Sequence, residues 1–420
     1  MASRPFAGPR QHAWDRKIGL VLPGGGARGA YQVGVLKALA KMLPRRAPNP
    51  FSVVSGTSAG AINAVVLASR AKLFHVAVGE MDRVWRNFRC EQVFRSDAWT
   101  MLKTSTHWLT ALVTGGLGTA NPKSLLNNQP LRQLLGNYIN FGGIQKSIDR
   151  GYLDAVAVTA AGYGSARSVT FYQGSGKHQP WDRVRRIGRR HEITLDHLMA
   201  SIAVPMIFPP VRLGDEYFGD GAMRQATPLS PAVHLGADRI LVIGARNEVP
   251  DPAPAPGATI PYPNLGSIAG YVLDALFMDG LSSDLERLTR INLTLDRVPG
   301  GEIVGDVGRL RFIDVFVMLP SQDIREIALR HFHEMPRPVR LLMHGLGALN
   351  HGGRQLISYL LFESGYTSEL IKLGYEDGLA REEELRAFME GAPIEAPGGI
   401  AGWQDLSDEY TGRFQLEELG

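Results

Sequence analysis

The sequence predicts an α/β protein with a largely parallel central sheet, because strand, tight turn and helix follow one another twice within its first 70 residues. In the first unit, the apolar run 18–22 leads through a glycine-rich loop into helical spacing of apolar residues. In the second unit, the apolar run 51–55 leads through a tight turn into the sequence GAINAVVLA. Short apolar runs that alternate with helices are typical of buried parallel strands and their crossover helices.

Later elements follow from the same patterns. The stretch 80–140 is expected to be helical and irregular, and 265–295 a long helix with a leucine stripe. The proline-rich stretch 250–263 cannot donate a ladder of N–H groups, so we expect a surface connector there. Strands are expected at 154–159, 168–172, 211–218, 239–243 and 312–319.

Charge is distributed unevenly along the 420 residues. The net charge is +4, yet residues 1–79 carry 11 Lys and Arg and one acidic residue, whereas residues 361–420 carry 14 acidic and 4 basic residues. The two ends either neutralise each other in the fold or are simply solvated, or the basic end is attracted to an anionic lipid surface. We expect no nucleic-acid partner, since no basic run is interleaved with aromatic residues.

The cysteine count and the lengths of the apolar runs indicate the cellular compartment of the protein. Cys90 is the only cysteine, which excludes an internal disulfide and a thiolate metal cluster. The amino-terminal stretch lacks an apolar signal-peptide core, no run reaches 18 apolar residues, and neither end carries a lipidation signal. We therefore expect a cytoplasmic protein that contacts membranes only peripherally. The best apolar candidate for that contact is 99–117, with burial in the core as the alternative.

The first glycine loop, PGGGARG, raises the question of what it holds. Gly24, Gly26 and Gly29 match a dinucleotide-binding spacing, but that fingerprint needs an acidic residue about 20 positions later. None occurs between Arg16 and Gly79, and no Gly-Lys-Ser/Thr follows to make a phosphate loop. The loop is therefore expected to offer its N–H groups to another anion, such as one that forms during a reaction.

The second loop, Gly56-Thr57-Ser58-Ala59-Gly60, has the pattern G-x-S-x-G between a strand and a helix. Such a turn exposes a serine hydroxyl as a nucleophile, and its small neighbours permit close packing. The start of the following helix would favour negative charge that develops beside the serine. The alternative is that Ser58 only caps this helix.

A serine nucleophile needs a base within hydrogen-bond reach. No histidine before residue 331 lies in a strand-end loop that resembles that of a triad histidine, whereas Asp220 follows a short strand and is flanked by two glycines. The alternative is that Asp220 belongs to an ordinary Asp-Gly turn. Taken together, Ser58, Asp220 and the loop at Gly24, Gly25 and Gly26 make a nucleophile, a base and an oxyanion hole.

Four motifs in order give the chain a resemblance to the patatin-like phospholipase family. They are GGGARG, GTSAG, ASIAVPMIFPPV at 200–211 and DGA at 220–222, and the resemblance spans roughly 17–243. It implies a three-layer α/β/α fold and hydrolysis of acyl esters in lipids, of the phospholipase A or lysophospholipase type. It also implies that neither a metal nor a cofactor is needed.

The resemblance also assigns roles to residues. It implies that Ser58 and Asp220 form a catalytic dyad, that Gly24, Gly25, Gly26 and Arg28 form the oxyanion hole, and that Gly56 and Gly60 shape the elbow. The third position of the family's Asp-Gly-Gly is Ala222 here. The expected domains are a catalytic core at 17–249, the connector at 250–263 and a mostly helical region at 264–420 that packs on the core with one strand near 312–319.

Several alternatives stay open at this point. Arg28 either braces its loop or binds a lipid phosphate, and the cluster Arg183, Arg185, Arg186, Arg189 and Arg190 is either a solvated turn or a headgroup site. A Ser-His-Asp esterase would instead use one of four late histidines, His331, His333, His344 or His351. The third alternative is a non-catalytic lipid-binding protein with the same fold. The sequence predicts no oligomeric state.

Overall fold

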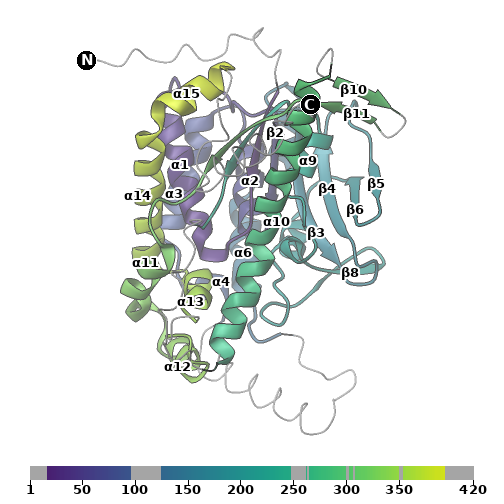
Figure 1. Cartoon of the computed structure of the whole chain (residues 1–420). Coiled ribbons are helices and arrows are strands. Elements are labelled where there is room, and N and C mark those ends of the chain that lie inside the picture. Colours follow the sequence, from purple (N-terminus) through teal and green to yellow (C-terminus); the bar gives the residue numbers. More distant parts are fainter. Residues whose placement is uncertain are drawn as a thin grey trace, which may run out of the picture.

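The computed structural model describes residues 17–95, 124–246, 262, 264–298, 302–305, 308–349 and 353–392. In these ranges one mixed sheet of ten strands lies at the centre of the molecule (Figure 1). Its strands are β1 (Ile18–Leu22), β2 (Val53–Thr57), β3 (Ala155–Gly162), β4 (Ser168–Gly174), β5 (Trp181–Arg183), β6 (Arg186–Arg190), β7 (Val211–Leu213), β8 (Glu216–Asp220), β9 (Arg239–Ile243) and β12 (Asp314–Met318). A separate hairpin consists of β10 (Glu302–Gly305) and β11 (Gly308–Arg311).

The sheet is parallel at its centre and antiparallel at one side. Its order is β12–β9–β1–β2–β3–β4–β6–β5, with β8 paired to β3 and β7 paired to β8. The pairs from β12 to β3 along this order, and the pair β4–β6, are parallel, whereas β3–β4, β3–β8, β5–β6 and β7–β8 are antiparallel. The predicted α/β class with a largely parallel sheet is confirmed.

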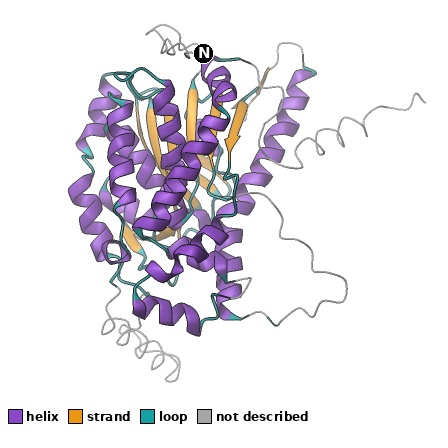
Figure 2. Ribbon diagram, turned by 90° about the vertical axis from the view of Figure 1, so that its left-hand side faces the viewer, coloured by secondary structure: helices purple, strands orange, loops and turns teal. Residues whose placement is uncertain are grey.

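Helices cover both faces of the sheet, as the two views in Figures 1 and 2 show. The helices before residue 246 are α1 (Gly29–Met42), α2 (Ala59–Ser69), α3 (Phe74–Arg86), α4 (Cys90–Val93), α6 (Gln129–Tyr138), α7 (Gly142–Asp149), α8 (Leu195–Ser201) and α9 (Ser230–His234). Those after residue 262 are α10 (Leu265–Asp296), α11 (Ile324–His331), α12 (Arg337–Gly345), α13 (Arg354–Leu360), α14 (Ser364–Ala380) and α15 (Glu382–Glu390). Short 3-10 turns are η1 (Gly26–Arg28), η3 (Gly221–Met223) and η4 (Phe332–Glu334).

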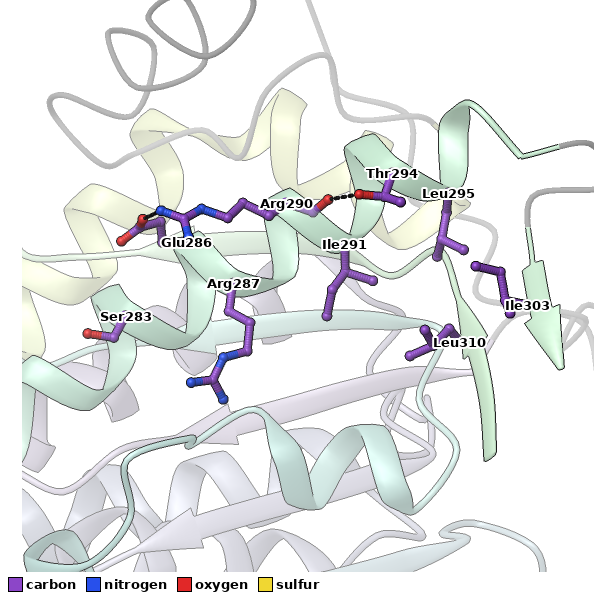
Figure 3. Close-up of a pocket in the computed structure, with 9 residues that line it drawn as sticks. All are labelled: Ser283, Glu286, Arg287, Arg290, Ile291, Thr294, Leu295, Ile303 and Leu310. Atoms are coloured by element: carbon purple, nitrogen blue, oxygen red, sulfur yellow. Dashed lines mark hydrogen bonds and ion pairs between the residues drawn. The ribbon is translucent and has the colours of Figure 1, made fainter. Parts of the chain in front are cut away.

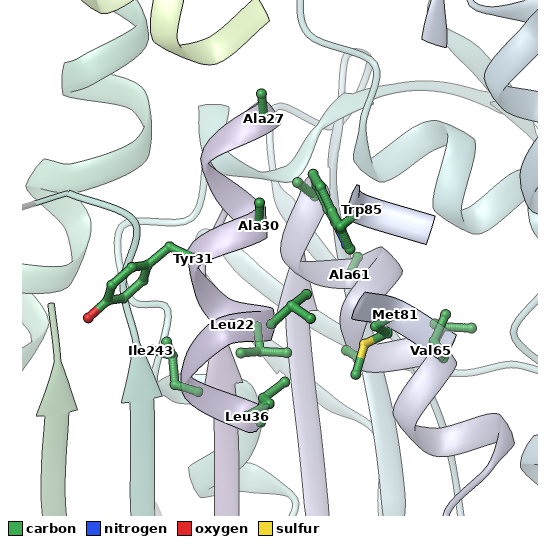
Figure 4. Packing of buried hydrophobic residues seen from close by; sticks show 14 of the residues in the cluster. Leu22, Ala27, Ala30, Tyr31, Leu36, Ala61, Val65, Met81, Trp85 and Ile243 are labelled. Carbon is green, nitrogen blue, oxygen red and sulfur yellow. The ribbon is translucent and has the colours of Figure 1, made fainter. Parts of the chain in front are cut away.

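Two hydrophobic clusters, one on each face, give the molecule three layers. Successive residues of a strand point to opposite faces, so Leu20 and Leu22 join one cluster and Val21 joins the other. The first cluster includes side chains of α1, α2, α3 and α14, and Figure 4 shows part of it around α1. The second includes Ala232 of α9 and Leu281 of α10. Because β1 is buried on both faces, its sequence IGLVL is apolar throughout.

The structure also differs from the expected elements. The stretch 211–218 is two strands, β7 and β8, because the chain turns at Gly214, whose φ is 63°. The strand predicted at 312–319 is β12, which joins the main sheet beside β9, whereas the hairpin β10–β11 was not predicted. Part of the arginine cluster forms β5 and β6 rather than a plain turn.

Two expectations fall outside the described residues. The apolar stretch 99–117 lies there entirely, and so does the proline-rich stretch 250–263 apart from Tyr262. The membrane-contact prediction for 99–117 therefore stays a prediction. In the described ranges, no helix combines the length and the hydropathy that a membrane crossing requires.

Candidate active site

Ser58 lies on a sharp turn between β2 and α2. Its φ of 54° and ψ of −128° are rare for a residue with a side chain, and the residue is 3% exposed. The turn brings α2 close to β1: a Cβ atom at Gly60 would lie 2.0 Å from the carbonyl oxygen of Leu22, and one at Gly56 would lie 2.4 Å from that of Gly60. Only glycine fits at these two positions, which explains the small residues of the motif.

Asp220 reaches Ser58 because two strands end at the same place on β3. Thr57, the last residue of β2, is opposite Thr159 of β3. Asp220, the last residue of β8, is opposite the next residue, Ala160. The parallel strand β2 and the antiparallel strand β8 therefore arrive from opposite directions along one edge of β3, and the residues at their ends become neighbours.

The carboxyl group of Asp220 is buried and incompletely hydrogen-bonded. The residue is 1% exposed, and its Oδ1 accepts the N–H of Ala222 at 2.9 Å. Its Oδ2 accepts no hydrogen bond from the described residues, although the Ser58 hydroxyl is near enough to affect the carboxyl group. Burial raises the pKa of Asp220 to about 7, while Ser58 and the Ala222 N–H act in the opposite direction. Such a carboxylate is a base of suitable strength at neutral pH.

The end of α8 and the residues just after it hold both Ser58 and Asp220 in place, a role that reasoning from the sequence missed. The Oγ of Ser201 accepts the backbone N–H of Ser58 at 2.9 Å and donates to the carbonyl oxygen of Thr159 at 2.7 Å. Two residues later, the carbonyl oxygen of Ala203 accepts the N–H of Asp220 at 2.8 Å. Ser201 and Ala203 both belong to the ASIAVP run. The motif was therefore recognisable in the sequence, although its role in holding Ser58 and Asp220 was not.

The first glycine loop faces the same site. Gly26 has a φ of 55°, and a Cβ atom there would lie 2.3 Å from the carbonyl oxygen of Tyr359. In the described part of the chain, the N–H groups of Gly24, Gly25 and Gly26 donate to no partner. The N–H of Arg28 is different, because it donates to the carbonyl oxygen of Gly25 at 3.1 Å. The structure thus leaves the three glycines, but not Arg28, with N–H groups available to an oxyanion.

The side chain of Arg28 braces the loop from within. It is 1% exposed, its Nε and one terminal nitrogen donate to Ser358 Oγ at 3.0 and 2.6 Å, and its guanidinium lies 3.9 Å from the ring centre of Tyr359. Asp274 of α10 completes the site as an ion-pair partner at 3.6 Å. A guanidinium enclosed in this way is not directed at a lipid phosphate. The C-terminal region, through α10 and α13, therefore supports the glycine loop.

A narrow apolar cavity opens beside Ser58. Its volume is about 50 Å³, and it is bounded by Gly26, Ser58 and a wall of aliphatic and aromatic side chains that includes Trp85, Phe208 and Phe362. These three side chains come from α3, from the segment after α8 and from the segment after α13, and other lining residues come from α2, α4, α6 and α10. The cavity offers an apolar surface next to the serine hydroxyl, with room for the part of an acyl chain close to its carbonyl.

Other candidate groups do not lie at this site. No described histidine lines the apolar cavity, and His331 is hydrogen-bonded to Glu334 and Glu369 at 2.7 and 2.5 Å. His351 lies outside the described residues. Among the described residues, no group of three or more His, Cys, Asp or Glu side chains is arranged to hold a metal ion. Cys90 is buried, and burial raises the pKa of its thiol, so it is no nucleophile.

Comparison with known proteins identifies the family of the chain. A family model described as patatin-like phospholipase matches residues 20–233. Lysophospholipase nte1 of Aspergillus terreus is 40% identical over 98 residues, which cover 20% of this chain and 6% of that protein. Lysophospholipase nte1 of Emericella nidulans is 37% identical over 112 residues, which cover 24% of this chain and 7% of that protein. The match thus spans only a small part of these curated relatives. VipD from Legionella pneumophila superposes with a TM-score of 0.37 at 13% identity, over 88% of this chain and 67% of VipD. Because the family model matches half of its length, the chain belongs to the patatin-like phospholipase family.

Proposed function

We propose that the chain hydrolyses carboxylic esters of phospholipids or lysophospholipids through an acyl-enzyme on Ser58, with Asp220 as the base. The observation that carries this proposal is the buried carboxyl group of Asp220, with a pKa of about 7, next to a serine on a strained turn. Membership of a phospholipase family supports the substrate class. The fungal relatives are named lysophospholipases, which supports lysophospholipids in particular.

The first half of the reaction acylates Ser58. The hydroxyl oxygen of Ser58 attacks the ester carbonyl carbon while Oδ2 of Asp220, which has no other hydrogen-bond partner among the described residues, takes the hydroxyl proton. The tetrahedral intermediate then collapses, the bond to the leaving alcohol breaks, and Asp220 returns the proton to the departing oxygen. The acyl group stays on Ser58 as an ester.

The second half releases the fatty acid. A water molecule attacks the acyl-enzyme carbonyl while Asp220 accepts one of its protons. Collapse of the second tetrahedral intermediate breaks the bond to the Ser58 oxygen, which recovers a proton from Asp220. The products are a free fatty acid and the unchanged enzyme.

The glycine loop would stabilise both intermediates. The unpartnered N–H groups of Gly24, Gly25 and Gly26 are the available donors, and Gly26 borders the cavity beside Ser58. A donor that is already oriented toward the oxyanion lowers the barrier by roughly 3 to 4 kcal/mol. The side chain of Arg28 supports this loop without touching the reacting atoms.

A fluorophosphonate probe tests the assignment of the nucleophile. We expect wild-type protein to be labelled at Ser58 and the Ser58→Ala variant to remain unlabelled. The matched control Ser364→Ala, at an exposed serine at the start of α14, should be labelled like wild type. Turnover of a short-chain ester should fall at least about 10³-fold in Ser58→Ala. Folded wild-type protein that takes no label at Ser58 would contradict the covalent mechanism.

Two other functions make different predictions in the same assays. A Ser-His-Asp esterase would lose activity when one of the late histidines is changed, yet His331 is engaged by two glutamates and no described histidine lines the cavity. A lipid-binding protein without activity would bind acyl chains and release no fatty acid. Mass spectrometry of lipid products from mixed extracts, wild type against Ser58→Ala, separates these functions and identifies the substrate.

A further inference from the structure

We propose that an arginine groove beside the Asp220 turn binds the phosphate of an anionic lipid headgroup and makes the enzyme select acidic over zwitterionic lipids. This inference rests on the proposed function, because the groove would bind the headgroup of the same lipid whose ester is cleaved at Ser58. The groove has a volume of about 790 Å³. Its arginines are Arg183, Arg185 and Arg186 around the β5–β6 turn, Arg224 just after η3 and Arg287 of α10.

The described lining of the groove is positively charged. No carboxylate occurs among its described lining residues, which are otherwise small, polar or apolar. Arg185, Arg224 and Arg287 are exposed, and their side chains form no hydrogen bond or ion pair in the described ranges. Figure 3 shows the contrast on α10: Arg290 pairs with Glu286, whereas Arg287 extends without a partner among the residues drawn.

Arg186 lies at the half-buried side of the groove, where the positive charges meet. Its terminal nitrogen donates to Thr227 Oγ1 at 2.7 Å. Burial lowers the pKa of Arg186, Asp284 opposes that effect, and Arg287 and Arg183 lower the pKa further. Asp284 itself is buried, accepts the N–H of Leu229 at 2.9 Å and has a pKa raised to about 6 by burial. At pH 7 this single carboxylate offsets at most one of the five arginine charges, so the groove keeps a positive charge.

The groove lies next to the reaction centre, because some of its lining residues are hydrogen-bonded to residues of the active site. Ala222 and Met223 line it, and the N–H of Ala222 is hydrogen-bonded to Asp220. Gln225, also in its lining, is hydrogen-bonded to the hydroxyl of Thr57, the residue before Ser58. The apolar cavity therefore begins at Ser58, and the cationic groove begins at the Asp220 turn. A phospholipid has the same order of groups: acyl chain, ester, glycerol and phosphate.

The chemistry of the groove favours a phosphate with excess negative charge. Guanidinium groups bind phosphate oxygens in pairs of charge-assisted hydrogen bonds. A phosphate monoester carries roughly −1.5 to −2 charges at pH 7, so phosphatidic acid suits several unpaired arginines. A choline or ethanolamine headgroup would add a cation to a site that already has five arginines in its described lining.

Monomeric lipids with matched acyl chains test the proposal without a membrane surface. The substrates are dihexanoyl phosphatidic acid, dihexanoyl phosphatidylcholine and dihexanoylglycerol, each below its micelle concentration. The test variant is Arg185→Gln with Arg287→Gln. The control is Arg45→Gln with Arg46→Gln, which removes the same charge from exposed residues between α1 and β2 whose side chains form no hydrogen bond or ion pair in the described ranges.

We expect wild type and the control to prefer phosphatidic acid over phosphatidylcholine in kcat/KM, mainly through a lower KM. The test variant should lose at least about tenfold of this preference, the effect of losing one charge-assisted hydrogen bond. No preference in wild type, or the same loss in the control, would overturn the headgroup assignment. If the test variant does not fold, the preference of wild type for phosphatidic acid over phosphatidylcholine still tests the proposal.

Two further measurements separate the possible sources of failure. Absence of hydrolysis for all three lipids, including the uncharged one, would contradict the proposed function, whereas hydrolysis without headgroup preference contradicts only this inference. Calorimetry on Ser58→Ala should show tighter binding of dihexanoyl phosphatidic acid than of inorganic phosphate. Equal affinity for the two would assign the groove to free phosphate and overturn its role in lipid recognition.

Discussion

The backbone N–H of Ser58 donates to the hydroxyl of Ser201 at 2.9 Å, and this bond ties the candidate nucleophile to a different segment of the chain. The same hydroxyl donates to the carbonyl oxygen of Thr159 at 2.7 Å, so Ser201 joins the elbow to β3. Ser58 has a φ of 54°, a conformation that persists only where the surroundings enforce it. Ser201 is therefore a positioning residue for the elbow.

Replacing Ser201 by alanine should lower the free energy of unfolding and slow turnover together. The change leaves a buried N–H and a buried carbonyl group without partners, which costs about 1 to 3 kcal/mol. A relaxed elbow should reduce kcat for a short-chain ester more than it changes KM. A suitable control is Ser147→Ala, because Ser147 is a buried serine on α7 that bonds within its own helix. If kcat is unchanged while stability falls, Ser201 does not position Ser58.

Asp220→Asn should reduce ester turnover by at least about 10²-fold, since an amide fills the same space but cannot accept the serine proton. Combining it with Ser58→Ala should cost little beyond Ser58→Ala alone, because residues that act as one unit are not additive. The exposed Asp215, on the β7–β8 turn, provides the control variant Asp215→Asn. Losses that multiply in the double variant would show that the two residues act separately.

The pKa of Asp220 predicts how activity depends on pH. Asp220 must be deprotonated to accept a proton, and its pKa is about 7. The value of kcat/KM should therefore rise with pH through this region and fall about tenfold per unit well below it. The profile should be measured with an uncharged short-chain ester, so that no substrate group titrates. Constant activity down to pH 5 would exclude Asp220 as the base.

The same pKa shift has the opposite effect on stability. Asp220 titrates at about 7 in the folded chain against 3.8 when unperturbed, so between these values the folded state binds more protons than the unfolded state. The free energy of unfolding therefore decreases as pH rises from about 4 to 7 on account of this group. Asp220→Asn removes the penalty and should be more stable than wild type at pH 8, by about 1 kcal/mol or more. Thermal unfolding of both proteins at pH 5 and pH 8 checks the sign.

Arg28→Lys should destabilise the protein although it keeps the charge. A lysine cannot reproduce the two hydrogen bonds to Ser358 Oγ or the stacking on Tyr359, so we expect a loss of about 1 to 3 kcal/mol and slower turnover. The matched variant Arg83→Lys, at an exposed position on α3, should change neither quantity. If Arg28→Lys weakened only the binding of anionic lipids, its guanidinium would belong to headgroup recognition instead.

Local sequence determined the elements that carry the chemistry. The apolar run of β1, the glycines beside Ser58 and the glycines around Asp220 are recognisable because strand burial, a tight turn and close backbone approach each need particular residue types within a few positions. The strand β9 and the long helix α10 also follow from short-range patterns. The strands β10 and β11 were not predicted, because each has only four residues, too few for a distinct pattern.

Only the tertiary structure decided which distant segments these elements contact. Ser58 and Asp220 are neighbours because β2 and β8 end at adjacent residues of β3, a register set by pairing across more than 160 residues of sequence. Burial of the Asp220 carboxyl group, and with it the raised pKa, depends on segments that local pattern does not connect. The partners of Arg28 come from α10 and α13, and the cationic groove joins Arg224 and Arg287 to arginines of the β5–β6 turn. Short-range propensities specify each strand and turn, whereas side-chain environments arise only when distant segments pack, and these environments set the chemistry of the site.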